Sequence, residues 1–187
     1  MAKKRQDQVI VIDVESTCWE GLPPVGEESE IIEIGICTLD VASGQRLHKR
    51  GLLVKPEHSQ VSEYCQQLTT LTQEQVDGGV SFAEACAVLR NEYLAKERVW
   101  ASYGDYDRRQ FERQCRARQM GYPFGLRHTN VKSLFALAQA LPHEVSVPEA
   151  LHMLNLPLEG VLHRGVDDAW NIAAILSTLL LRARAPG

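Results

Sequence analysis

The sequence predicts an α/β fold with a mixed sheet, antiparallel over its first three strands and then parallel, flanked by helices. Two observations predict this class. Runs rich in Val and Ile, typical of buried strands, dominate residues 8–54, and segments with an apolar face at helical spacing dominate the rest. A short strand-like run at 98–102 stands between helical segments, and this alternation is typical of an α/β sheet.

The expected strands are bounded by turn residues. Residues 8–14 and 31–39 have the β-branched content of buried strands, and the Pro- and Gly-rich stretch 21–30 is short enough to be the loop between them. Residues 50–54 form a third candidate after the Ser43-Gly44 turn. We expect the second and third strands to pair as a hairpin.

The expected helices carry start and stop signals. Ser81 and Glu84 form a capping box that predicts a helix running to about residue 96. Further helices are predicted from about 106 to Gly121, from 131 to 141, after Pro148, which suits a first helical position, and from 166 to 181.

Length and composition favour one domain. The 187 residues are 44% apolar and 24% charged, so we expect a single domain over 9–181, a flexible N-terminus over 1–8 and a C-terminal tail over 182–187. No apolar run approaches the roughly 20 residues that span a bilayer. Five scattered cysteines with no C-x-x-C pair indicate reduced thiols and a cytoplasmic protein. A net charge of −4 means that a nucleic acid would have to be attracted locally or through bound cations.

Asp13 and Glu15 end the first apolar run. In a strand, residues i and i+2 point to the same face, so both carboxylates project together. Like charges this close repel each other unless a cation lies between them. D-x-E is a common tripeptide, however, and two strand-end residues facing water explain it equally well at this point.

Carboxylates recur at two later element boundaries. Asp105 and Asp107 lie between an expected strand and helix, and Asp168 lies where the last helix begins. An acidic residue in a first helical turn also complements the helix dipole, so each taken alone has a structural explanation. His163 and Asp168 are five residues apart, and they share a site only if His163 lies in the loop and Asp168 in the first turn.

Together these residues suit phosphodiester hydrolysis. Two divalent ions roughly 3.5–4 Å apart can neutralise the scissile phosphate, activate a water and stabilise the leaving oxygen. Mg²⁺ prefers carboxylate oxygens, and a nearby histidine can accept the proton of the water near neutral pH.

Three motifs resemble those of the DEDDh 3′→5′ exonucleases. They are D-x-E-S-T (Asp13, Glu15, Ser16, Thr17), an aromatic-Asp pair followed by Phe (Tyr106, Asp107, Phe111), and H-x4-D (His163, Asp168). The chain most resembles the histone-mRNA 3′-end, or Eri-type, group. The shared features are Cys18, the loop 20–24, the IIEI strand, LTTLTQEQVD at 68–77 and D-D-x-x-N-I at 167–172. The resemblance covers about 9–180 and implies a ribonuclease H-like fold.

The resemblance also implies a role for each site residue. Asp13 would contact two divalent metal ions, Mg or Mn, Glu15 and Asp168 would hold the nucleophile-side ion, Asp107 would support the second, and His163 would be the general base.

Two positions near the second motif need comment. Asp107 is preferred to Asp105 because Tyr106 and Phe111 complete the motif around Asp107. Many relatives have Asn or Asp where this chain has Tyr103, four residues before Asp107.

The resemblance implies that substrate is bound beside the first motif. The expected binding residues are Ser16, Thr17, Cys18, Trp19 and Leu71. Trp19 could stack on a base or lie buried beneath the loop at 23–24, and Leu71 could be an apolar wedge between bases or a core residue. A basic stripe, Arg109, Arg113 and Arg116, could hold a phosphate backbone or form a solvated helix face.

The sequence therefore predicts a metal-dependent 3′→5′ exonuclease that releases nucleoside 5′-monophosphates from the 3′ end of single-stranded nucleic acid, with RNA favoured over DNA. Two alternatives remain open. One is a DNA 3′-exonuclease of the proofreading or repair type, and the other is a nuclease-dead module that binds nucleic acid or a partner. No membrane association is expected, and the sequence identifies no protein partner.

Overall fold

Strand β1 (Gln8–Ser16) is the central strand of a five-stranded sheet with the order β3-β2-β1-β4-β5. The computed structural model describes residues 5–184. Strands β2 (Ile31–Asp40) and β3 (Arg46–Leu53) extend the sheet in antiparallel fashion, whereas β4 (Val99–Ser102) and β5 (His128–Asn130) are parallel. The predicted mixed sheet is confirmed.

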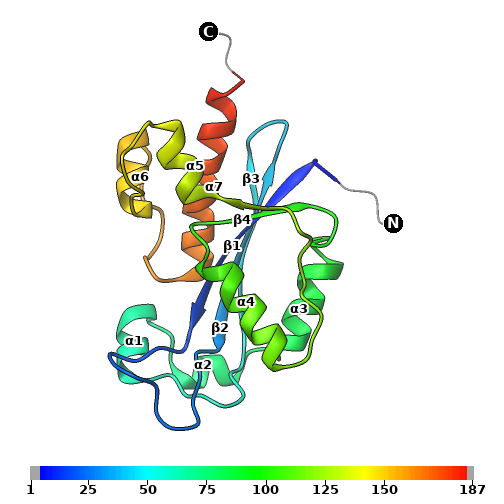
Figure 1. Cartoon of the computed structure of the whole chain (residues 1–187), viewed down its shortest axis with the longest axis vertical. Coiled ribbons are helices and arrows are strands. Elements are labelled where there is room, and N and C mark those ends of the chain that lie inside the picture. The colour runs from blue at the N-terminus through cyan, green and yellow to red at the C-terminus, as the bar shows by residue number, and fades with distance from the viewer. Residues whose placement is uncertain (1–4, 185–187) are drawn as a thin grey trace.

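Seven helices are found among the described residues, and the larger ones cover both faces of the sheet (Figure 1). They are α1 (Glu63–Thr69), α2 (Gln73–Asp77), α3 (Phe82–Asn91), α4 (Tyr106–Ala117), α5 (Val131–Ala138), α6 (Val147–Leu154) and α7 (Gly165–Arg182). Helices α3 and α4 lie on one side of the sheet, and α5, α6 and α7 lie on the other. None of these helices is long and apolar enough to cross a membrane.

The side chains of β1 alternate between two hydrophobic clusters. Ile10, Ile12 and Val14 pack with residues of α3 and α4, whereas Val9 and Val11 pack with residues of α5, α6 and α7. Because this alternation has a period of two, the next odd-numbered residues of β1, Asp13 and Glu15, project toward the α7 side. Strand β1 thus brings both carboxylates to the N-terminal end of α7.

Local sequence signals predicted where helices start better than where they end. Ser81 and Glu84 form both hydrogen bonds of the predicted capping box, but α3 ends at Asn91 rather than near residue 96, and Leu94 adopts a left-handed φ of 55°. In α6 the capping residue is Ser146, which makes Pro148 the second helical residue rather than the first.

Other boundaries also differ from the predictions. Strand β3 begins at Arg46, four residues before the expected start, and β5, α1 and α2 were not predicted. Gln8 belongs to β1 and Arg182 to α7, so neither belongs to a tail. The rest of the predicted flexible N-terminus and C-terminal tail falls partly on residues 1–4 and 185–187, which lie outside the described residues.

Two glycines let α7 approach the sheet closely. A Cβ on Gly35 of β2 would lie 1.7 Å from the carbonyl oxygen of Gly165, and a Cβ on Gly165 would lie 3.0 Å from the carbonyl oxygen of Asp13. The first turn of α7 therefore rests directly on the backbone of β1 and β2. This contact places Asp168 over the end of β1.

We predict that Gly35→Ala displaces the start of α7 and destabilises the protein by at least about 1–3 kcal/mol, the usual cost of overpacking. Urea denaturation monitored by circular dichroism measures this. The matched control is Gly21→Ala, because nothing in residues 5–184 lies within 4 Å of a Cβ there. Wild-type stability in Gly35→Ala would contradict the close packing of α7 on the sheet.

Candidate active site

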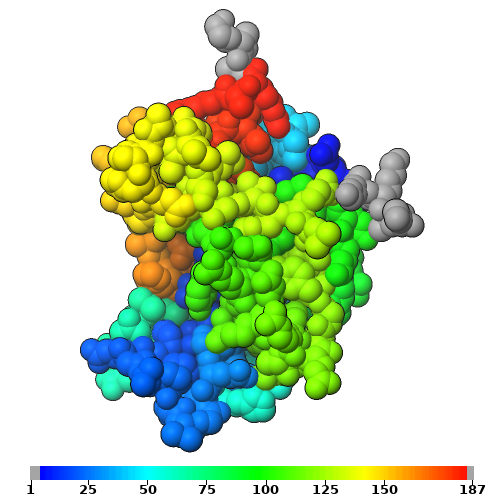
Figure 2. Space-filling view, in the orientation of Figure 1, coloured from blue at the N-terminus to red at the C-terminus, as the bar shows by residue number. Residues whose placement is uncertain are grey.

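A cavity of about 550 Å³ lies at the C-terminal end of β1. In the space-filling view, dark blue atoms of the β1 region are visible where α4 (green), the start of α7 (orange) and the α1 segment (teal) meet (Figure 2). The lining residues are Asp13, Val14, Glu15, Ser16, Cys18, Leu68, Tyr103, Tyr106, Asp107, Lys132, Ser146, Val147, Pro148, Leu162, His163 and Asp168. All five predicted catalytic residues therefore face one cavity.

Three carboxylates converge on one point of this cavity. Oxygen atoms of Asp13, Glu15 and Asp168 lie within 4.8 Å of one another. One oxygen of Asp168, Oδ2, accepts a hydrogen bond of 2.8 Å from the backbone N–H of His163. The other, Oδ1, is buried and finds no hydrogen-bond partner among the described groups. A buried acceptor without a partner is costly, so this oxygen fits a cation ligand.

Asp107 is held against β1 by a hydrogen bond. Its Oδ1 accepts from the backbone N–H of Val14 at 2.9 Å, and the side chain is 4% exposed. Asp105 instead occupies the N-cap position of α4 and forms an ion pair of 3.2 Å with Arg108. Asp105 does not line the cavity, so the structure brings Asp107 and not Asp105 to the other carboxylates.

His163 lies in the loop before α7, and Asp168 lies in the first turn of that helix, as a shared site requires. His163 has a left-handed φ of 60°, and its imidazole is exposed at the edge of the cavity. The neighbouring Asp167 forms an ion pair of 2.6 Å with Lys49 and accepts from the N–H of Val161. Asp167 therefore pairs with Lys49 and Val161, whereas Asp168 lies with the other carboxylates.

Glu33 is a site residue that sequence analysis missed. It lies opposite Glu15 in the β1–β2 ladder and is only 1% exposed. Its carboxylate accepts from the backbone N–H of Gly165 at 2.9 Å and forms an ion pair with Arg164. The available signal was a charged residue inside the apolar run IIEI. Glu33 fixes the start of α7 and so positions Asp168.

The carboxylate cluster raises the pKa values of its own members. Burial, followed by the charges of Asp107 and Glu15, raises the pKa of Asp13 well above its usual range. Burial, then the charge of Asp168, raises the pKa of Glu15 to about 8, and Arg164 opposes this only in part. Burial also raises the pKa values of Asp107 and Asp168 to about 6. A set of oxygen donors so short of positive charge suits hard divalent cations.

The predicted binding residues divide into two groups. Ser16 and Cys18 line the cavity. Thr17 does not, because its backbone N–H donates to Glu30 and its hydroxyl accepts from the N–H of Glu30 and donates to the carbonyl of Glu28. Trp19 lines a separate hollow beside α1. Thr17 and Trp19 therefore lie away from the carboxylates.

Leu71 also lies away from the cavity. It is fully buried in a cluster with Ile32, Cys65 and Val76. Helix α1 ends at Thr69, and the left-handed Thr70 turns the following residue into the core. Leu68, one position before that end, lines the cavity instead. Leu71 therefore occupies the core position that was the alternative to a wedge between bases.

Comparison with known proteins identifies the family. The model of the family described as Exonuclease (RNase_T) matches residues 10–176. The chain belongs to this exonuclease family. The predicted resemblance to exonucleases is thereby confirmed.

Relatives of this exonuclease include two proteins named 3′-5′ exoribonuclease 1. The Rattus norvegicus protein is 30% identical over 187 residues, which cover 93% of this chain and 53% of the relative. The Homo sapiens protein is 29% identical over 185 residues, which cover 93% and 52%. The chain thus spans about half the length of these curated relatives.

Solved structures share the fold of this chain. The nuclease domain of 3′hExo, a DEDDh family member bound to rAMP, superposes with a TM-score of 0.84 at 27% identity, covering 97% of this chain and 95% of that one. A 3′-exonuclease in a structure of histone mRNA stem-loop recognition gives 0.82 at 27% identity, covering 94% and 82%. The predicted ribonuclease H-like fold is confirmed.

We predict that in the presence of a chelator this protein loses stability as pH rises from about 4 to about 8. The carboxyl groups ionise near pH 4 when unfolded, but the folded pKa of Glu15 is raised to about 8, so the unfolded state releases protons first. We expect Mn²⁺ to reverse the loss and to raise the melting temperature at pH 8 by at least about 5 °C.

Thermal unfolding at a series of pH values measures this, and Glu15→Gln should flatten the decline. The control is Glu20→Gln, since Glu20 is exposed outside the cavity. An equal decline in the wild type and Glu15→Gln, or no response to Mn²⁺, would refute this electrostatic explanation.

Proposed function

We propose that this chain is a metal-dependent 3′→5′ exonuclease that removes nucleoside 5′-monophosphates from the 3′ end of single-stranded RNA. One observation carries this proposal. Three carboxylates lie within 4.8 Å of one another in a cavity that also contains Asp107 and His163, and the chain belongs to an exonuclease family. The family relationship supports the reaction class, and the carboxylates supply its chemistry.

The carboxylates would hold two divalent cations, Mg²⁺ or Mn²⁺. When bound, these ions would neutralise the scissile phosphate and lower the pKa of the attacking water. Asp13 would contact both ions, and Glu15 and Asp168 would hold the nucleophile-side ion, a role that the unpartnered Oδ1 of Asp168 supports. Asp107 would support the second ion partly through water, because Val14 already uses one of its oxygens.

His163 would act as the general base. Its backbone N–H is fixed by Asp168, while its exposed imidazole lies at the cavity edge, where a water attacking the phosphate can reach it. Histidine is the side chain that most often serves as a general base. Asp168 would thus serve twice, as a cation ligand and as the acceptor that orients the loop carrying the base.

The terminal nucleotide would lie between two walls of the cavity. Ser16, Cys18 and Leu68 form one wall, and Tyr106 and Pro148 belong to other elements that line it. The names of the relatives, 3′-5′ exoribonuclease 1, support RNA as the preferred substrate. A terminal 2′-hydroxyl also offers an extra donor and acceptor by which RNA can be distinguished from DNA.

We also propose the domain limits and the compartment. The family match at 10–176 supports one exonuclease domain over 9–181. All five cysteines are free thiols, which supports a reducing, cytoplasmic setting.

We expect digestion to begin at a free 3′-hydroxyl, to proceed stepwise and to be faster on RNA than on DNA. Matched oligonucleotides labelled at the 5′ end, each with a 3′-phosphate version as the blocked control, test this in the presence of Mg²⁺ or Mn²⁺. A DNA ladder as fast as the RNA ladder would favour a DNA 3′-exonuclease. A single internal cut on a blocked strand would refute the exonuclease proposal.

We further expect His163→Ala to lower kcat by about 10²–10⁴-fold, the usual range for loss of a general base, with little change in metal affinity. Single-turnover kinetics and Mn²⁺ titration measure the two effects separately. His152→Ala is a matched control, because that exposed histidine of α6 does not line the cavity. If His163→Ala lost metal affinity as severely as Asp13→Ala, His163 would be a ligand rather than a base.

A further inference from the structure

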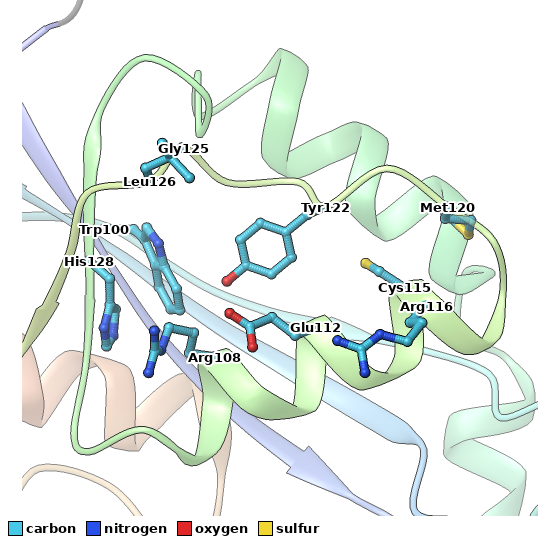
Figure 3. Close-up of a pocket in the computed structure, with 10 residues that line it drawn as sticks. All are labelled: Trp100, Arg108, Glu112, Cys115, Arg116, Met120, Tyr122, Gly125, Leu126 and His128. Atoms are coloured by element: carbon cyan, nitrogen blue, oxygen red, sulfur yellow. The ribbon is translucent and has the colours of Figure 1, made fainter.

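A second cavity, of about 350 Å³, lies between α4 and the segment 120–128 (Figure 3). Arg108, Glu112 and Arg116 line it on the helix side, and Tyr122 and His128 line it on the segment side. We call it the α4 cavity. None of its lining residues belongs to the carboxylate cavity.

The helix side of the α4 cavity has a charge pattern of plus, minus, plus. Arg108, Glu112 and Arg116 follow one another at intervals of four, so they share one face of α4 and span about 12 Å along its axis. Arg108 forms an ion pair of 3.2 Å with Asp105. The guanidinium of Arg116 makes no ion pair with any residue of the described chain and is exposed.

The opposite wall is aromatic and firmly packed. Trp100 is fully buried, stacks on Phe124 with ring centroids 4.2 Å apart, and contacts the ring of His128 at 4.2 Å. Tyr122 packs edge-on against Phe124 at 5.6 Å. In Figure 3 the Tyr122 ring reaches from its segment toward α4, with its hydroxyl facing Glu112. A single-strand site typically combines such rings with cationic side chains.

Two polar atoms in these walls are buried without hydrogen-bond partners. They are Nε of Arg108 and the hydroxyl of Tyr122, neither of which is paired within residues 5–184. Buried polar atoms are normally satisfied, so these two atoms favour a polar partner supplied from within the cavity. A suitable ligand would offer an acceptor near Arg108 and a polar group near Tyr122.

We propose that the α4 cavity holds a nucleotide of the substrate strand, upstream of the 3′ end that reacts. A nucleotide within a strand has a phosphate on each side, which matches an arginine at each end of the cavity. Its sugar hydroxyls and base amines are donors that suit Glu112 between the arginines. Free inorganic phosphate and a free mononucleotide each bring a phosphate for only one arginine.

The position of the cavity agrees with this assignment, which rests on the proposed function. Arg108 directly follows Asp107, so only the first turn of α4 separates the two cavities. Of the basic stripe, only Arg116 lines the α4 cavity, whereas Arg113 donates to the carbonyl of Ser29 and to the side chain of Gln110.

Binding of a 5′-labelled RNA decanucleotide, measured by fluorescence anisotropy in the presence of a chelator, tests the proposal. The chelator removes cations from the carboxylates, so the assay reports the remaining contacts. We expect Arg116→Gln to weaken binding by about tenfold and to reduce the slope of log K against log salt by about 0.7, as for one lost phosphate contact. Tyr122→Phe should weaken binding severalfold without changing the slope.

The matched control is Arg182→Gln, which removes the same charge from the exposed C-terminal end of α7. An Arg116→Gln variant that behaves like this control would overturn the proposal. The proposal would also be overturned if Arg116→Gln weakened binding of a dinucleotide as much as binding of the decanucleotide. Adenosine monophosphate that binds the cavity as tightly as the decanucleotide would assign it to free nucleotides instead. If Arg116→Gln weakened RNA binding as expected but the wild-type chain hydrolysed no RNA or DNA, the proposed function would be refuted and the α4 cavity assignment would stand.

Discussion

The structure depends on one costly arrangement, the crowding of four carboxylates at the end of β1. Burial raises the pKa values of all four, the charges of other members of the set raise those of Asp13, Glu15 and Asp107 further, and Arg164 is the cation that opposes this at Glu15. Such crowding is unfavourable for a fold on its own and is typical of a functional site. Hydrogen bonds from the backbone N–H groups of Val14 and His163 hold Asp107 and Asp168 in place against this repulsion.

Both layers of helices contribute to that arrangement. On one face, the close contact between Gly35 and Gly165 lets α7 bring Asp168 onto the sheet, and Glu33 fixes the first residues of that helix. On the other face, α4 brings Asp107 to the N–H of Val14. The active-site candidate therefore lies where the two hydrophobic clusters meet at a strand end. A change in either cluster is transmitted to the carboxylates through the first turn of a helix.

Sequence patterns predicted what depends on local periodicity. The two-residue period of β1 placed Asp13 and Glu15 on one face, and the five-residue spacing of His163 and Asp168 required the loop and helix positions that are observed. Such local patterns do not predict contacts between segments that are distant in the sequence. The resemblance left Leu71 either at the substrate or in the core, and the short helix α1, which turns it into the core, has too little periodicity to be recognised in the sequence. Glu33 escaped notice because its partners, Arg164 and Gly165, lie 131 and 132 residues away in the sequence.

We propose that divalent cations relieve the carboxylate crowding and thereby create the catalytic site. A crystal structure with Mn²⁺ and a nucleoside monophosphate, in which anomalous scattering locates the metal, tests this proposal. We expect two Mn²⁺ peaks roughly 3.5–4 Å apart, with Asp13 between them and Oδ1 of Asp168 bonded to one. Crystals grown with Mn²⁺ that show no anomalous peak among Asp13, Glu15 and Asp168 would contradict it.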